Sequence, residues 1–278
     1  MQDSAATESR RLNERDVSPA DIDHYRANGY VCLSAVATQE EIKTFRPVIE
    51  NVVRATTESR DTQGRLDDYS KMFQQVTNAW RLDRRVEEFV LARKFGRIAA
   101  RLMGVKGVRL YHDQALFKPP GGERTYWHQD MFYWPLDTDR TITMWMPLVD
   151  VDAGMGTMIF ACGSHRDGLV SASPISESAG EFVGKVVKEK GYECRSHVLK
   201  AGDATFHSGY TIHSAYPNKS ESTREVMTVI YYADGTRLLE RPNEYQVVDM
   251  NVFLPGTRPG DPAVSPLNPI VYEETIAV

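Results

Sequence analysis

The chain has 278 residues, of which 41% are apolar and 26% are charged, a composition typical of a globular domain and not of a disordered protein. Its net charge of −5 and its lack of a long basic run argue against a nucleic-acid or anionic-membrane partner. The three cysteines are far apart and form no CxxC pair, which favours a reducing compartment. The N-terminal sequence has no apolar signal segment, and no run approaches the roughly eighteen apolar residues of a membrane helix. We therefore expect a cytoplasmic protein.

The first predicted element is a helix followed by a strand. Residues 1–17 are polar and are expected to be flexible. Ser18 and Pro19 form a typical helix start, a capping residue followed by proline in the first turn, and Gly29 is a typical helix end. The alternating residues 30–36 predict a strand directly after it.

Two more helical segments are predicted before residue 104. Thr38 and Glu41 form a capping-box pattern, and the helix that they open is predicted to reach residue 56. After a charged stretch, the apolar residues of 84–103 recur at helical spacing.

The pattern changes to short strands from residue 108 onward. Residues 108–117 are strand-like and end at the break PPGG, and residues 141–151 alternate between two faces. Further short strands follow, separated by turn residues, which predicts one mainly β domain over 1–278, a sandwich or barrel with helices on one face. The last segment, 245–278, contains five prolines and is predicted to be an extended wrapping segment.

Two His-x-Asp pairs are candidates for a metal site. Residues two apart on a strand share a face, so His128 and Asp130 in TYWHQDM could hold one ion. His165 and Asp167 in GSHRDG lie between glycines, which is typical of a turn whose side chains bind a loop. Two imidazoles and one carboxylate suit Fe(II), Mn or Zn and leave three coordination positions open. The alternative is that the first pair consists of polar surface residues beside core aromatics.

A third ligand and a cosubstrate anchor are sought downstream. The candidate ligands are His197, His207 and His213, of which His207 is interpreted as a structural histidine. Arg224 follows His213 by eleven residues across a turn-rich stretch, so a strand–turn–strand arrangement is expected to bring the two together on adjacent strands. A guanidinium pairs in bidentate fashion with a carboxylate and could hold an acidic cosubstrate that chelates the metal. The alternative for Arg224 is a surface ion pair with a neighbouring glutamate.

With HQD at 128–130, His213 and Arg224 in this order, the sequence resembles the phytanoyl-CoA dioxygenase (PhyH) family of Fe(II)- and 2-oxoglutarate-dependent oxygenases. The resemblance covers residues 18–235 and includes DIDHYRANGYVCLSAV, LYHDQALFKPPGG, TYWHQDMFYW, DAGMGTMIFACGSHRDG and GDATFHSGYTIHSAYPNKSESTREV. It implies a double-stranded β-helix (jelly-roll, cupin-like) core with the N-terminal helices packed on one face.

The resemblance also implies roles for single residues. The implied Fe(II) ligands are His128, Asp130 and His213. The implied contacts of 2-oxoglutarate are Arg224, which binds its distal carboxylate, Gln114 and Trp145.

Three positions bear on how the chain departs from relatives. Some relatives have serine where this chain has Ala215, so a hydroxyl contact to the cosubstrate is lost. A lysine that some relatives use upstream has no clear equivalent, and Gln75 or Asn78 is the candidate replacement. Members that halogenate carry a small residue in place of the carboxylate, so Asp130 favours hydroxylation.

The expected activity is hydroxylation of an unactivated C–H bond in a small-molecule substrate, with O2 consumed and succinate and CO2 released. The aromatic residues near the predicted site are candidates for the pocket wall: Phe132, Tyr133, Trp134 and Tyr210. Two other classes stay open, a Zn- or Mn-dependent hydrolase or isomerase that uses the same triad, and a non-catalytic cupin-like binding protein.

Overall fold

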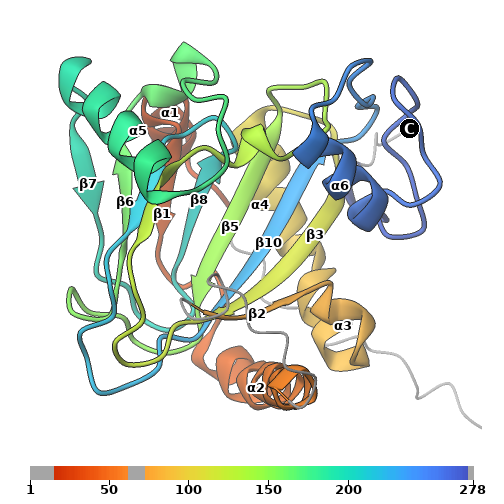
Figure 1. The fold of residues 1–278 in the computed structure, drawn as a ribbon. Coiled ribbons are helices and arrows are strands. Elements are labelled where there is room, and N and C mark those ends of the chain that lie inside the picture. The colour runs from red at the N-terminus through yellow and green to blue at the C-terminus, as the bar shows by residue number, and fades with distance from the viewer. Residues whose placement is uncertain (1–15, 62–72, 275–278) are drawn as a thin grey trace, which may run out of the picture.

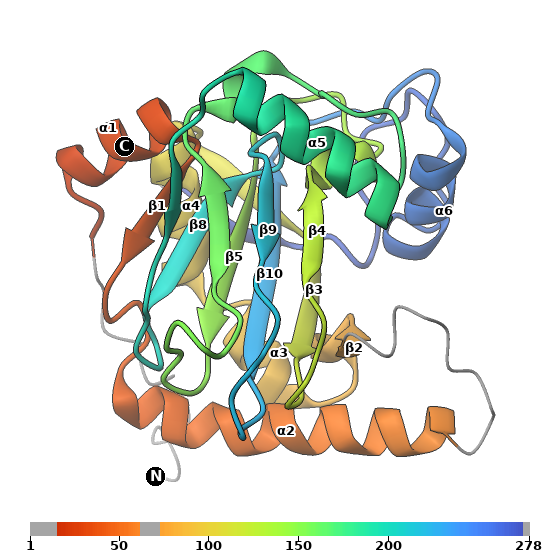
Figure 2. The same ribbon diagram turned by 60° about the vertical axis from the view of Figure 1, so that its left-hand side comes forward.

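Two antiparallel β-sheets are stacked face to face in the computed structural model, which describes residues 16–61 and 73–274 (Figure 1, Figure 2). Within these residues, the major sheet has the strand order β1 (Tyr30–Leu33), β8 (Ala204–Ser208), β5 (Thr141–Pro147), β10 (Val226–Ala233), β3 (Gly107–Phe117) and β11 (Ile270–Glu273), and β2 (Gln74–Thr77) also pairs with β3. The minor sheet has the order β4 (Thr125–His128), β9 (His213–Ala215), β6 (Met158–Ala161) and β7 (Cys194–Ser196). The mainly β fold predicted from the sequence is confirmed.

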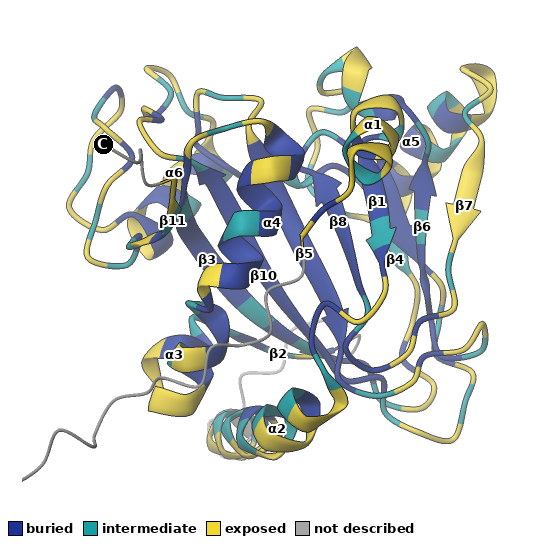
Figure 3. Cartoon of the chain, turned by 180° about the vertical axis from the view of Figure 1, so that it is seen from behind, coloured by how far each residue is buried: buried dark blue, intermediate teal, exposed yellow. Residues whose placement is uncertain are grey.

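Helices cover the outer faces of the two sheets. The described helices are α1 (Pro19–Asn28), α2 (Gln39–Asp61), α3 (Arg84–Val90), α4 (Arg93–Met103), α5 (Glu177–Glu189) and α6 (Glu244–Phe253). Helix α4 lies across the outer face of the major sheet (Figure 3), and α5 crosses the minor sheet (Figure 2). None of the described helices has the length and the hydropathy that a membrane span requires.

Strand β5 shows how the sequence divides the core from the site. Ile142, Met144 and Met146 pack into the apolar core beneath the N-terminal helices. Thr143 and Trp145 point the other way, into the space between the sheets. The predicted alternation is therefore correct, but all seven residues of β5 are buried because the second face lines the interior of the sandwich.

A β-bulge divides strand β3 into two parts. Ile230 of β10 pairs with His112, but the next residue, Tyr231, pairs with Leu110, so Tyr111 has no partner of its own in β10. Leu110 consequently packs in the helix-side core, whereas Tyr111 and His112 both lie on the inner side.

The predicted helix starts are confirmed. The Ser18 hydroxyl accepts a hydrogen bond from the Asp21 amide at 3.2 Å, and α1 ends at Gly29 with a left-handed φ of 77°. The Thr38–Glu41 capping box is also present, with bonds of 3.2 and 2.7 Å. Glu41 additionally forms an ion pair of 2.6 Å with the buried Lys94, which ties α2 to α4.

Several predicted boundaries differ from the structure. The strand predicted over 30–36 ends at Leu33, before a turn in which Ala35 has a φ of 50°. The helix that begins after Thr38 extends to Asp61. The segment 84–103 forms two helices, because Ala92 takes a non-helical ψ of 115° between them. Of the predicted flexible residues 1–17, those before residue 16 lie outside the described residues.

The prediction of an extended segment over 245–278 is wrong in part. Residues 244–253 form α6, because Asn243 and Gln246 make a reciprocal capping box with bonds of 2.8 and 2.9 Å. Strand β11 then pairs with β3. The stretch that contains the prolines, between these two elements, is irregular, and residues 275–278 lie outside the described residues.

Candidate metal centre

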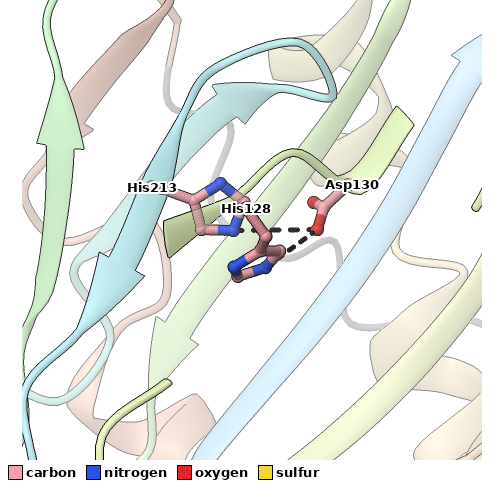
Figure 4. A group of neighbouring side chains, drawn as sticks. All are labelled: His128, Asp130 and His213. Carbon is pink, nitrogen blue, oxygen red and sulfur yellow. Dashed lines mark ion pairs between the residues drawn. The ribbon is translucent and has the colours of Figure 1, made fainter. Parts of the chain in front are cut away.

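Three side chains converge between the sheets in the order predicted from the sequence. His128 ends β4, Asp130 begins a short 3-10 helix two residues later, and His213 begins β9. Strands β4 and β9 pair with His128 opposite His213, which places the two imidazoles side by side (Figure 4). The Asp130 Oδ1 atom lies 3.5 Å from His128 Nε2 and 3.7 Å from His213 Nε2. One ligand atom from each residue lies within 4.8 Å of the others, a spacing at which they can share one metal ion.

Hydrogen bonds orient each of the three groups. His128 Nδ1 is 2.7 Å from the Tyr126 carbonyl and His213 Nδ1 is 2.9 Å from the Thr211 carbonyl. A carbonyl can only accept, so Nδ1 carries the proton in both rings and Nε2 is left with a free lone pair. This is the arrangement in which imidazole binds a metal.

The Asp130 carboxylate is held through its other oxygen. Oδ2 lies 3.2 Å from the Thr143 hydroxyl and 3.4 Å from His207 Nε2. Oδ1 therefore faces the two histidines. His207 is not a member of the three-residue cluster, in agreement with its interpretation as a structural histidine, and it contacts the carboxylate and not the shared position.

The charge states of the triad also suit a metal. Burial raises the pKa of Asp130, but His213 and the hydrogen bonds of its other imidazole neighbours lower it more, so that its pKa lies well below the ordinary range. Burial, with a contribution from His128, lowers the pKa of His213 well below its ordinary value. Asp130 is therefore ionised and His213 neutral at neutral pH, and both are in their metal-binding form.

The second His-x-Asp pair is used elsewhere. His165 Nε2 contacts the Arg26 carbonyl at 3.2 Å, and Asp167 accepts a hydrogen bond from the Tyr192 hydroxyl and pairs with Lys190 at 3.0 Å. The interpretation of GSHRDG as a turn that binds its surroundings is confirmed.

A cavity of about 420 Å³ between the sheets connects the triad to the other predicted residues. Strand register orders its wall on the major sheet into rows that run across the strands. One row consists of His112, Ile230, Thr143 and His207. The next row consists of Gln114, Thr228, Trp145 and Thr205, of which the first three line the cavity. Asp130 contacts the first row, and Arg224 lies beyond the second, where it bridges to Lys118 at the end of β3.

Arg224 is almost completely buried, with 2% of its surface exposed, and lines the same cavity. Its guanidinium donates one hydrogen bond from Nη1 to the Gly156 carbonyl and lies 5.3 Å from the centre of the Trp145 ring. Nε has no partner among the described residues. Burial lowers the pKa of Arg224 to about 9. A buried guanidinium with a free donor edge is a site for an anion.

Two expectations about Arg224 are wrong. Its predicted alternative, a surface ion pair with a neighbouring glutamate, is absent from the part of the chain that the structure describes, and Glu225 instead binds Arg46 in a bidentate pair of 2.6 and 2.8 Å. Arg224 and His213 are also not on adjacent strands, since β9 belongs to the minor sheet and Arg224 precedes β10 of the major sheet. They meet across the sandwich, on the wall of one cavity.

A second buried cation, Lys118, was not predicted from the sequence. Its Nζ atom donates to the Glu123 carbonyl at 2.6 Å and to the Tyr216 carbonyl at 3.3 Å, and its side chain is fully buried. Burial and the nearby Arg224 lower its pKa to about 7. Neither cation has an acidic partner within the described residues, and Arg224, the one of the two that lines the cavity, makes this end of it electropositive. The sequence signal was its position directly before the PPGG break. Strand periodicity alone does not indicate whether a lysine at that position is buried or exposed.

The remaining predicted residues divide between the cavity wall and other places. Those that line the cavity are Gln75, Gln114, Tyr133, Trp134, Trp145 and Ala215. Those that do not are Asn78, Phe132 and Tyr210. Asn78 takes a left-handed backbone conformation, and its backbone N–H donates to the Asp113 carbonyl at 3.0 Å, which fixes the residue outside the cavity wall.

The far end of the cavity holds two polar residues that sequence reasoning did not select. His112 is 2% exposed, and burial lowers its pKa to about 4. Asp249, on α6, accepts a hydrogen bond from the Tyr111 hydroxyl at 3.2 Å, and burial raises its pKa to about 7. Both line the cavity together with Phe253.

Comparisons with known proteins agree with this geometry. The family model described as phytanoyl-CoA dioxygenase (PhyH) matches residues 25–226, which include all three residues of the triad and Arg224. The chain belongs to the PhyH family. A curated PhyH-like relative, a probable alpha-ketoglutarate-dependent hypophosphite dioxygenase of Stutzerimonas stutzeri, is 22% identical over 221 residues, 75% of this chain and 76% of that protein.

Solved structures show a likeness in fold over nearly the whole chain. The non-heme alpha ketoglutarate dependent carbocyclase SnoK from nogalamycin biosynthesis is 26% identical with a TM-score of 0.75, covering 92% of this chain and 96% of that one. The epimerase SnoN from the same biosynthesis is 22% identical with a TM-score of 0.69, covering 91% and 98%. The jelly-roll fold of this PhyH member is thus shared with oxygenases of more than one reaction type.

Proposed function

We propose that this PhyH member is an Fe(II)- and 2-oxoglutarate-dependent dioxygenase that hydroxylates a C–H bond of a small-molecule substrate. The observation that carries the proposal is the position of the triad and of Arg224 on one cavity wall, with a metal-binding cluster next to a buried cationic anchor. The net reaction joins one oxygen atom of O2 to the substrate and the other to the cosubstrate, which leaves as succinate and CO2.

The residues of the chain divide the work of binding. His128, Asp130 and His213 would hold Fe(II), and a bound iron with three open positions supplies the redox chemistry that couples the cosubstrate to O2. Arg224 would bind the distal carboxylate of 2-oxoglutarate. Gln114 and Trp145 form the row between the triad and Arg224, so they would flank the chain of the cosubstrate.

Electrostatics support a dicarboxylate in this place. Arg224 and Lys118 are two buried cations without an acidic partner in the described residues, and an anion between Arg224 and the metal would compensate them. The ring of Trp145 and the side chains of Met158 and Leu116 line the cavity, and their apolar surface would limit the access of water to the cosubstrate. A site for a metal-dependent hydrolase would not require this anchor.

Asp130 supports oxygen transfer to the substrate. Its carboxylate points Oδ1 to the shared metal position, where a halogenating site would need room for a halide ion. Because the relatives include a carbocyclase and an epimerase, the product must decide the reaction. Hydroxylation adds one oxygen atom to the substrate mass, ring closure removes a pair of hydrogens, and epimerisation leaves the mass unchanged.

The proposal is tested by succinate formation. The protein is purified without oxygen, loaded with Fe(II) and 2-oxoglutarate, and exposed to O2 with a panel of small molecules. Succinate is expected from the wild type and from His24→Ala, which removes an exposed histidine of α1, but not from His128→Ala. Succinate at the same level in wild type and His128→Ala would contradict the proposal, and hydrolysis of panel compounds with Zn or Mn in the absence of O2 would replace it.

A further inference from the structure

The end of the cavity away from Arg224 is built around one carboxylate. Lys118 directly follows β3 and lies six residues after His112, so His112 is about 20 Å along the extended chain from the residue that bridges to Arg224. Across the sheet, His112 is two strands from Thr143, which contacts the metal-facing Asp130, a distance of about 10 Å. A substrate that lies between the metal-facing Asp130 and His112 would place a C–H bond near the metal and a second group near His112.

The bulge in β3 creates this end of the cavity. Because Tyr111 and His112 both lie on the inner side, they meet the same face of α6, on which Asp249 and Phe253 are one turn apart. The His112 ring stacks on Phe253 with centroids 4.0 Å apart and an interplanar angle of 19°. The Tyr111 hydroxyl binds Asp249 Oδ2 at 3.2 Å. Helix α6 is fixed in turn by Gln246, which donates to the Trp134 carbonyl at 3.2 Å.

Asp249 has no basic partner within the described residues. None of the ion pairs there includes it, and Arg224, the one described lysine or arginine on the cavity wall, lies at the opposite end. Burial, with a smaller contribution from the negative charge of Asp130, raises the pKa of Asp249. His112 Nδ1 is buried without a partner as well. A half-buried carboxylate without a cationic partner and a buried imidazole nitrogen without a hydrogen-bond partner, both on the cavity wall, indicate that a ligand supplies what they lack.

The surroundings of Asp249 favour a cation over a neutral donor. The cavity wall there contains the rings of Phe253, Trp134 and Tyr133, whose faces attract a positive charge. The Tyr111 hydroxyl donates to Asp249 Oδ2, whereas Oδ1 has no hydrogen bond to a described residue and is left for a ligand. The Tyr133 hydroxyl accepts a hydrogen bond from the Ile175 amide at 2.6 Å, which fixes its ring on the cavity wall. We propose that Asp249, supported by His112 and Phe253, binds a protonated amine of the primary substrate and selects amine-bearing compounds. This inference rests on the proposed function, which makes the cavity a substrate site, but its test measures binding and does not depend on turnover.

The test measures binding without turnover. Wild type is loaded with Zn(II) and 2-oxoglutarate, and calorimetry or saturation-transfer NMR compares tryptamine with N-acetyltryptamine and tryptophol, which share its ring but carry no charge. Tryptamine is expected to bind about tenfold or more tightly than either neutral compound. The preference is expected to disappear in Asp249→Asn, which keeps the shape of the side chain, and to persist in Glu244→Gln, which removes an exposed carboxylate from the same helix.

Each outcome decides the inference. Equal binding of the three compounds by wild type would overturn it, tighter binding of tryptophol would indicate a hydroxyl-bearing substrate instead, and a preference that persists in Asp249→Asn would assign the amine to another group. Unchanged 2-oxoglutarate affinity in Asp249→Asn is expected and shows that the variant is folded. The same comparison on metal-free protein separates the two proposals. A preference for tryptamine in that protein would support the amine site even if the succinate assay failed to support the dioxygenase activity.

Discussion

The anchoring role of Arg224 gives the sharpest quantitative prediction. The guanidinium uses Nη1 for the Gly156 carbonyl, so its remaining edge, Nε and Nη2, is available for both oxygens of a carboxylate. Arg224→Lys keeps the positive charge but offers no planar pair of donors, and Arg224→Ala removes both.

The magnitude follows from the number of bonds that are lost. A hydrogen bond to a charged group contributes about 1.5–3 kcal/mol, and each 1.4 kcal/mol changes an affinity tenfold. Arg224→Lys, which loses one of two bonds, is expected to raise the Kd of 2-oxoglutarate about 10- to 100-fold. Arg224→Ala is expected to exceed that and to leave Lys118 as the remaining buried cation at this end of the cavity.

The assay is an anaerobic titration of the Fe(II)-loaded protein with 2-oxoglutarate, followed through the visible charge-transfer band of the chelate. Pyruvate, which chelates through the same keto acid but has no distal carboxylate, is the matched ligand. Wild type and the surface control Arg101→Ala should prefer 2-oxoglutarate strongly, whereas Arg224→Ala should bind the two keto acids alike. If Arg224→Ala kept the preference of the wild type, the distal carboxylate would be bound elsewhere and the reasoning from burial and free donors would be refuted.

Three further predictions concern the support of the site and the fold. His207→Phe keeps a ring beside the metal-facing carboxylate but removes the polar contact of 3.4 Å between Nε2 and Asp130, so the Kd for Zn(II), measured by chelator competition, should rise about tenfold or more; an unchanged value would show that the contact is incidental. Asp113 is fully buried and its pKa is raised to about 7. Its folded form therefore binds a proton more readily than its unfolded form, and the stability of the wild type should fall relative to Asp113→Asn as pH rises from about 4 through 7 in urea titrations; parallel curves would exclude this. Gly202→Ala places a Cβ 2.4 Å from the Ala37 carbonyl oxygen and should cost about 3 kcal/mol or more, against about 1 kcal/mol for Gly235→Ala, which has a similar φ and open space; equal losses would mean that the backbone shifts freely.

The sequence predicts this fold well where local signals and burial agree. Ser18 and Gly29 delimit α1 because capping and the left-handed turn are local properties of those residues. The alternation in β5 is legible because one face packs on helices and the other lines a cavity. Helix α6 was missed although Asn243 and Gln246 carry a capping signal, since the prolines that follow dominate the composition of the segment.

The candidate site divides in the same way. His128 and Asp130 are close in sequence, and their spacing with His213 and Arg224 is that of a known family, so motif reasoning reaches them. Lys118 and Asp249 were not reached, because their importance depends on burial and on the packing of α6 against β3. No periodicity in the sequence reports which face of a bulged strand a residue will take.

The bulge at Tyr111 has a consequence for how the chain tolerates changes in length. Strand β3 is in effect two half-strands in opposite phase, one facing the helices with Val108 and Leu110 and the other facing the cavity with His112 and Gln114. Deleting Tyr111 would restore regular pairing with β10 and keep both half-strands on their present faces, because Leu110 and His112 would then alternate as direct neighbours. Deleting a residue within either half-strand, such as Asp113, would instead shift part of the strand by one residue, so that either the apolar pair would turn into the cavity or the polar pair would turn into the helix-side core. A change in length by one residue should therefore preserve both faces only at the bulge, and other insertions or deletions should be confined to the loops beyond the two ends of the strand.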